Sequence, residues 1–150
     1  MANSAKQQLV EFLMANAVEK VAELTEQAKS LKESRNTESK STAGDKHAVG
    51  RAMAQTELDN LEKRIEELKK QANTIKNLPL DKREDVGRGS LVETTQGTFF
   101  LAVGFGRVEH EGKTFFIISP AAPIGQAILG KKQNDTFRFR EQIITITCLS

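Results

Sequence analysis

The residues of this chain that are best placed to do chemistry lie between positions 42 and 47, in the run Thr-Ala-Gly-Asp-Lys-His. Asp45 supplies a carboxylate, and carboxylate oxygens can bind a hard cation such as Mg²⁺. One carboxylate alone makes a weak site, because Mg²⁺ is usually held by a carboxylate together with substrate oxygens and water. Asp45 would therefore serve mainly if it entered a site that already held metal and phosphate. The alternative is that it stabilises the start of a helix, where the helix dipole favours negative charge.

The rest of the chain offers little for catalysis, since it contains two histidines and one cysteine. Cys148 has no neighbouring base that would activate it as a nucleophile, and we interpret it as a structural, partly buried thiol. His110 stands between two glutamates and is interpreted as a turn residue. The run Gly-Phe-Gly at 104–106 lacks the third glycine and the following helix of a phosphate-binding loop, so we interpret it as a strand bend. An enzyme is disfavoured.

Two stretches of apolar residues determine how the run at 42–47 is positioned. Both repeat at alternating steps of four and three, and they pair in reverse order when the chain folds back. This pattern predicts an antiparallel coiled-coil hairpin with its turn near residues 42–45. The paired coil would be roughly 30 Å long at 1.5 Å per residue. The two seams consist of Val10, Met14, Ala17, Val21, Leu24, Ala28 and Leu31, and of Ala54, Leu58, Leu61, Ile65, Leu68, Ala72 and Ile75.

The predicted helices run from near Ser4 to the mid-thirties and from about Ala48 to a point before Pro79, because proline disfavours helix at the residue before it. A long hairpin carries its tip far from its base, which makes the tip the place to look for function. From periodicity alone, a dimerisation arm or a spacer is an equally good interpretation. The sequence leaves the oligomeric state open.

The pattern changes after the Leu-Pro-Leu run at 78–80, which is the predicted linker between a hairpin domain (1–78) and a second domain (79–150). Short apolar and β-branched runs there predict strands. A proline at the start and a glycine just past the end predict one short helix over 123–130. The predicted fold class is α+β, a coiled-coil hairpin followed by a small antiparallel sheet with one short helix. The predicted strands are 90–95, 98–103, 114–119, 136–140 and 142–148.

Charge and cysteine usage narrow the class of protein further. The 22 basic and 20 acidic residues give a net charge of +2, which argues against general nucleic-acid binding and against a membrane-surface protein. Between positions 29 and 51 there are six basic residues and three acidic ones, so the distal hairpin is locally basic. Lys40 and Arg51 are the predicted basic face of the coil. The single cysteine fits a reducing compartment, no apolar run reaches membrane-spanning length, and no signal peptide is evident, so we expect a cytoplasmic protein.

The segment from Ile118 to Lys132, together with the following Asn134-Asp135 step, resembles a signature of the Gre transcript-cleavage factors, the GreA and GreB family. In that family the signature lies in a C-terminal FKBP-like α+β domain that follows an N-terminal antiparallel coiled coil. The resemblance implies that the partner is bacterial RNA polymerase. It also implies that the C-terminal domain docks at the rim of the polymerase secondary channel while the coiled coil reaches towards the active site. The implied docking residues are Ser119, Pro120, Pro123, Ile124 and Gly125.

The resemblance also assigns a role to the tip. The tip of a Gre factor has the pattern Gly-Asp, two residues, Glu-Asn, and its two carboxylates help to hold the second catalytic Mg²⁺ of the polymerase during cleavage of backtracked RNA. Gly44 and Asp45 match, Lys46 and His47 fill the two intervening positions, and Ala48 stands where the family has glutamate. Asp45 is thus the residue expected to assist catalysis in trans, on a Mg²⁺ shared only within the polymerase complex.

The tip and the basic face would lie near the 3′ end of the nascent RNA, where Lys40 and Arg51 could contact phosphates. With one carboxylate missing, we expect cleavage to be stimulated weakly or not at all. Two alternatives stay open. One is a competitor or inhibitor that binds the channel without stimulating cleavage. The other is a coiled-coil interaction protein with a different partner.

Overall fold

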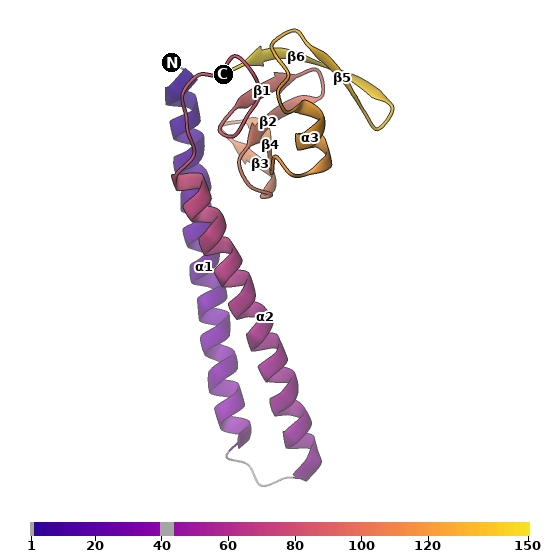
Figure 1. Cartoon of the computed structure of the whole chain (residues 1–150). Coiled ribbons are helices and arrows are strands. Elements are labelled where there is room, and N and C mark those ends of the chain that lie inside the picture. Colours follow the sequence, from indigo (N-terminus) through magenta and orange to yellow (C-terminus); the bar gives the residue numbers. More distant parts are fainter. Residues whose placement is uncertain (1, 40–43) are drawn as a thin grey trace. The chain divides into compact units, whose positions relative to one another are not determined.

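The computed structural model describes residues 2–39 and 44–150, with side chains described for residues 5–34 and 49–150. The chain divides into two compact units. One unit is the distal hairpin, Ala15–Ala72, and the other combines the residues up to Met14 with Asn73–Ser150. Figure 1 shows two long helices and a sheet that carries one short helix. In the described part of the chain, no helix is long and apolar enough to cross a membrane.

The hairpin consists of α1 (Ala2–Ser39) and α2 (Gly44–Lys76). The two helices run side by side in opposite directions (Figure 1), and an ion pair of 3.7 Å between Lys32 and Glu62 joins them. The residues of both predicted seams are buried or half-buried, whereas most residues between them are exposed. The antiparallel hairpin predicted from the heptads is therefore confirmed. The buried residues of the seam in the distal unit are Ala17, Leu24, Ala28, Leu58, Ile65 and Leu68.

The second helix begins at Gly44, four residues earlier than the predicted start at Ala48. No proline lies between positions 44 and 76, and a carboxylate at position 45 suits a helical first turn. The first helix likewise continues to Ser39, beyond the predicted end in the mid-thirties. Of the predicted turn at 42–45, residues 42 and 43 lie outside the described residues.

The second unit contains a six-stranded sheet in the order β3-β4-β2-β1-β6-β5. Neighbouring strands are antiparallel except for β2 and β4, which are parallel, with Phe99 opposite Phe116. The predicted small antiparallel sheet with one short helix is confirmed, except that β2 and β4 form one parallel pair that was not predicted. The elements are β1 (Leu91–Thr94), β2 (Gly97–Leu101), β3 (Gly106–His110), β4 (Lys113–Ile118), α3 (Pro123–Ile128), β5 (Thr136–Phe139) and β6 (Gln142–Leu149).

Strand β3 corrects the interpretation of His110 as a turn residue. His110 is the last residue of β3 and pairs with Lys113 of β4. The turn is formed instead by Glu111 and Gly112, whose φ angles of 51° and 77° match the tight turn that joins twisted strands. The His110 ring lies 4.4 Å from the ring of Phe12, centroid to centroid, so it packs against the base of α1.

The sheet has an apolar core on each of its two faces, because successive residues of a strand point to opposite sides. Phe100 and Ile117 pack with Leu9, Leu13 and Ile75 from the base of the hairpin. Their neighbours point the other way, into a second core that includes Phe99, Leu101, Ile128 of α3, Phe137 and Ile146. The basal ends of the predicted seams therefore belong to the sheet's core.

Two side chains in this unit differ from what their types suggest. Lys6 of α1 is fully buried, and its Nζ donates a hydrogen bond of 3.2 Å to the backbone oxygen of Asp81. Burial lowers the Lys6 pKa below its ordinary value of 10.5, the nearby Arg83 lowers it further, and Asp81 opposes both effects.

Cys148 is exposed on β6, so its prediction as a partly buried thiol is wrong. Its strand is next to β1, where Cys148 pairs with Glu93.

Candidate functional site

The backbone of the predicted tip is helical from Gly44 onwards, so positions 45 and 48 lie three residues apart at the start of α2. The side chains of Gly44, Asp45, Lys46, His47 and Ala48 lie outside the described residues, and so does Lys40. Arg51, the other predicted basic residue, is exposed on α2. Within the part of the chain whose side chains are described, no group of three or more histidine, cysteine, aspartate or glutamate residues could hold a metal ion.

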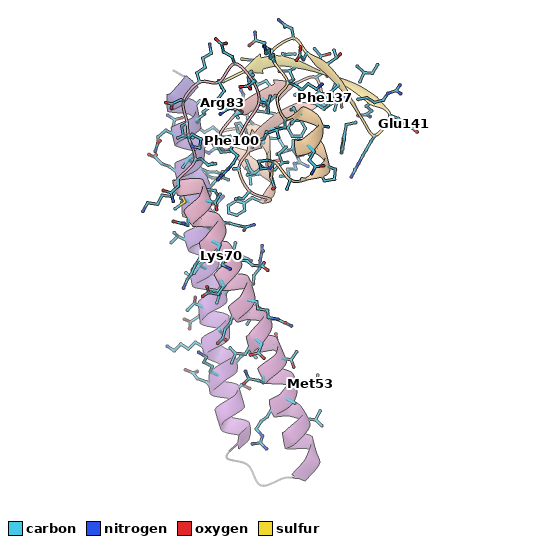
Figure 2. All side chains as sticks on the ribbon, viewed as in Figure 1. Met53, Lys70, Arg83, Phe100, Phe137 and Glu141 are labelled. Atoms are coloured by element: carbon cyan, nitrogen blue, oxygen red, sulfur yellow. The ribbon has the colours of Figure 1, made fainter. Side chains whose placement is uncertain are left out.

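The distal part of α2 also presents apolar side chains to solvent. Val49 and Met53 are 58% and 68% exposed. They line a shallow hollow of about 530 Å³ together with Ala52, Thr56, Glu57 and Asn60, at the spacing of one helix face. Figure 2 labels Met53 on this part of α2.

The segment that carries the Gre-like signature forms a tight turn followed by α3. The backbone N–H of Ala122 donates to the Ser119 carbonyl over 3.0 Å, and the N–H of Ala121 donates to the Ser119 Oγ over 3.1 Å. Pro123 then opens α3, where its missing N–H costs nothing and its fixed φ suits a helix. Beyond the turn, α3 packs on the sheet through Ile124, Ala127 and Ile128.

Gly125 is required by the close approach of α3 to this turn. A Cβ at position 125 would lie 2.3 Å from the Ser119 carbonyl oxygen and 3.0 Å from two Pro120 backbone atoms. Real Cβ atoms essentially never come so close to backbone, so any side chain here would push α3 away. Ser119, Pro120 and Gly125 therefore shape the turn and the helix.

The two remaining signature residues, Pro123 and Ile124, line a groove of about 500 Å³ on the α3 side of the sheet. We call it the aromatic groove. Its apolar walls come from β2, β4, β5 and β6, and the Phe99 and Phe116 rings lie 5.5 Å apart, centroid to centroid. The lining residues are Gln96, Phe99, Phe116, Pro123, Ile124, Phe139, Arg140, Gln142 and Ile144.

The polar lining of the groove comes from two turns. Gln96 lies in the turn between β1 and β2, and Arg140 and Gln142 lie at the turn between β5 and β6. The guanidinium carbon of Arg140 stands 5.1 Å from the centroid of the Phe139 ring, within range of a cation–π contact. Figure 2 labels Glu141 at the end of this hairpin and Phe137 near α3.

The groove has the character of a binding site. Concave surfaces lined by aromatic and aliphatic side chains with a few polar groups are typical of sites that take apolar ligand groups and orient them by hydrogen bonds. Pro123 and Ile124, two of the docking residues that the signature implies, line this groove, whereas neither its aromatic residues nor Arg140 was named from the sequence. The signal for them is weak, because Phe99, Phe116 and Phe139 lie on three strands that the sheet order brings to one face.

No family model matches the chain, and no curated protein matches its sequence. Several solved structures match it along almost its whole length. The GreA factor homolog 1 (Gfh1) protein of Thermus thermophilus is 20% identical, with 99% of this chain and 94% of that chain covered and a TM-score of 0.35. A structure described as the transcription factor Gfh1 is 20% identical, with coverage of 99% and 92% and a TM-score of 0.35. Thermus aquaticus Gfh1 is 18% identical, with coverage of 97% and 94% and a TM-score of 0.36.

Proposed function

We propose that this chain is a Gre-like transcription factor that binds bacterial RNA polymerase in the cytoplasm. The observation that carries the proposal is the fold of the signature segment. Its serine, prolines and glycine form a turn and a helix start that bring Pro123 and Ile124 to a groove. An antiparallel hairpin in the same chain supports the proposal, since a stiff rod of small cross-section can enter a narrow channel.

In this proposal the domain at 79–150, with the base of the hairpin, docks at the rim of the secondary channel, and the tip of the hairpin extends towards the polymerase active site. Lys40 and Arg51 would contact the phosphates of the nascent RNA near its 3′ end. The chain is not itself an enzyme, because hydrolysis belongs to the polymerase.

The donor set at the tip does not suffice to hold Mg²⁺ by itself. Asp45 offers one carboxylate, and the methyl group of Ala48 offers no oxygen where a glutamate would complete the set. Lys46 adds a positive charge beside Asp45. Any Mg²⁺ near Asp45 would be the polymerase's own. This observation favours a second candidate function, in which the chain occupies the channel as a competitor or inhibitor without stimulating cleavage.

The proposal is tested by measuring the binding of the full chain to core RNA polymerase and then transcript cleavage on backtracked complexes. We expect tight binding and weak or absent stimulation of cleavage. Binding without any stimulation selects the competitor, whereas failure to bind polymerase contradicts both candidates and favours a coiled-coil protein with another partner.

The variant Ala48→Glu tests the tip directly. We expect it to raise cleavage, because positions 45 and 48 lie one helical turn apart and two carboxylates can converge on one ion. Removal of one carboxylate with Asp45→Asn is expected to abolish residual cleavage while polymerase binding stays nearly unchanged. Strong cleavage that survives Asp45→Asn would contradict the role given to Asp45.

A further inference from the structure

The mouth of the aromatic groove contains one cation that has no carboxylate partner. Arg140 lines the groove and stacks on Phe139, and among the described residues no ion pair includes it. In the same unit Arg83 pairs with Asp85 and Arg107 pairs with Glu109, whereas Arg88 and Arg138, like Arg140, belong to no ion pair among the described residues. A planar guanidinium suits two-pronged recognition of a carboxylate.

The backbone that places Arg140 is strained. Arg140 and Glu141 have φ angles of 50° and 66°, in the left-handed region that glycine and asparagine prefer in a two-residue hairpin turn. Here the strained turn places a guanidinium at the edge of an apolar groove.

The lining of the groove selects the class of ligand. Three phenylalanine rings and two isoleucines can receive one or two apolar side chains, and the Gln96 and Gln142 amides can hydrogen-bond to peptide backbone. A nucleic-acid strand is disfavoured, because binding a phosphate backbone uses several cations and Arg140 is the one cation in the lining. Peptide with an acidic residue matches both the apolar wall and the unpaired charge.

We propose that the aromatic groove binds a segment of the partner protein in which an apolar side chain stands next to an aspartate or glutamate, and that Arg140 binds that carboxylate. This inference rests on the proposed function, since it names the chemistry of the polymerase segment that docks. The apolar side chain supplies most of the affinity, and Arg140 supplies selectivity for the acidic neighbour.

The first test measures binding of the full chain to core RNA polymerase, with Arg140→Gln compared against Arg138→Gln. Arg138 is exposed on β5 and lies on the strand face opposite Phe139, so its variant removes the same charge outside the groove. We expect Arg140→Gln to weaken binding about fivefold to tenfold, as for a partly exposed charge-assisted hydrogen bond, and Arg138→Gln to change it less than twofold. Equal effects of the two variants would overturn the role of Arg140.

A second test does not depend on the polymerase. The acetylated peptide Ser-Gly-Leu-Phe-Asp-Gly-Ser and its Asn-for-Asp counterpart are titrated into the full chain, and the backbone amide shifts of the groove residues are followed by NMR. We expect the acidic peptide to bind about fivefold more tightly, with the preference lost in Arg140→Gln. No preference, or no binding at millimolar peptide, overturns the inference. A wild-type chain that discriminates between the peptides but does not bind polymerase contradicts the proposed function and leaves the groove's chemistry supported.

Discussion

Lys6 is a residue whose charge opposes folding. Its amino group is fully buried and has a single hydrogen bond, to the Asp81 carbonyl oxygen, so burial lowers its pKa in the folded chain. Between that lowered pKa and 10.5, the unfolded chain binds more protons than the folded chain, and stability therefore rises with pH in this window. Below the window the cost of burying the charge is fully present.

We therefore expect Lys6→Met to raise the free energy of unfolding at pH 7 by about 1 kcal/mol, because it removes a buried charge while keeping the length of the side chain. The gain should shrink as the pH approaches 10.5, because Lys6 of the wild-type chain then loses its charge in the unfolded state as well as in the folded state. Urea denaturation of both proteins at several pH values measures the difference. A gain that is constant with pH would show that folding does not lower the Lys6 pKa.

Gly125 is the residue on which the position of α3 depends most directly. Gly125→Ala places a methyl group against the Ser119 carbonyl, and we expect it to cost about 2–3 kcal/mol of stability, as overpacking does in a rigid site. Gly104→Ala is the matched control, because nothing lies within 4 Å of its added Cβ, and it should change stability by no more than about 0.5 kcal/mol. The measurement is the midpoint of urea denaturation, compared at an unchanged dependence of the unfolding free energy on urea. Similar midpoints for the two variants would contradict the close approach of Gly125 to the Ser119 carbonyl.

At the scale of elements, the hairpin seam makes a prediction that depends on burial alone. Leu24 is 6% exposed and Val18, six residues earlier on the same helix, is 64% exposed. Leu24→Lys is expected to cost about 3–5 kcal/mol, because it puts an unpaired charge in an apolar seam, while Val18→Lys should cost about 0.5 kcal/mol or less. Thermal unfolding followed by circular dichroism compares them. Equal losses would mean that Leu24 does not lie in the seam.

A helix or strand could be predicted from the sequence when the pattern that indicates it lies within a short stretch of the chain. The heptad repeats that contain Leu24, Leu58 and Leu68 predict the hairpin correctly, because both helices contain complete repeats. Strand β3 was missed because it is an edge strand whose Arg107 and Glu109 face solvent, so its apolar pattern is thin. The parallel pairing of β2 with β4 depends on where β3 turns back, and no short-range pattern encodes that.

The site divides in the same way. Pro123, Ile124 and Gly125 stand in one continuous signature, so the sequence identifies them, although it does not show that Gly125 shapes the fold while Ile124 faces the groove. Phe99 and Phe139 are 40 positions apart. They meet across the sheet only because β2, β1, β6 and β5 follow one another in the strand order. Arg140 acquires its position from a backbone conformation that arginine rarely adopts.

At the scale of the whole molecule, the compact unit with the sheet predicts which fragments fold. A shortened chain in which a flexible linker of about six residues replaces the distal unit, and so joins Met14 to Asn73, should fold cooperatively. A linker of that length spans the distance between two packed helices. Residues 79–150 alone should not, because Leu9, Leu13 and Ile75 would no longer cover Phe100 and Ile117. Circular dichroism and amide NMR dispersion distinguish the two. Cooperative unfolding of 79–150 alone would contradict the shared core.

One of the two cores of the sheet brings together Leu9 of α1 and Ile117 of β4, which is 117 − 9 = 108 positions later in the sequence. Strand β1 must also wait for β6, because Val92 of β1 pairs with Leu149 of β6. During synthesis the two helices can therefore pair long before the sheet closes, because the hairpin is complete by Lys76. The apolar face at the base of the hairpin stays uncovered throughout this interval. A nascent chain of this fold is thus a natural client for chaperones at the ribosome exit, and its sheet, rich in contacts between distant residues, is the slow step of folding.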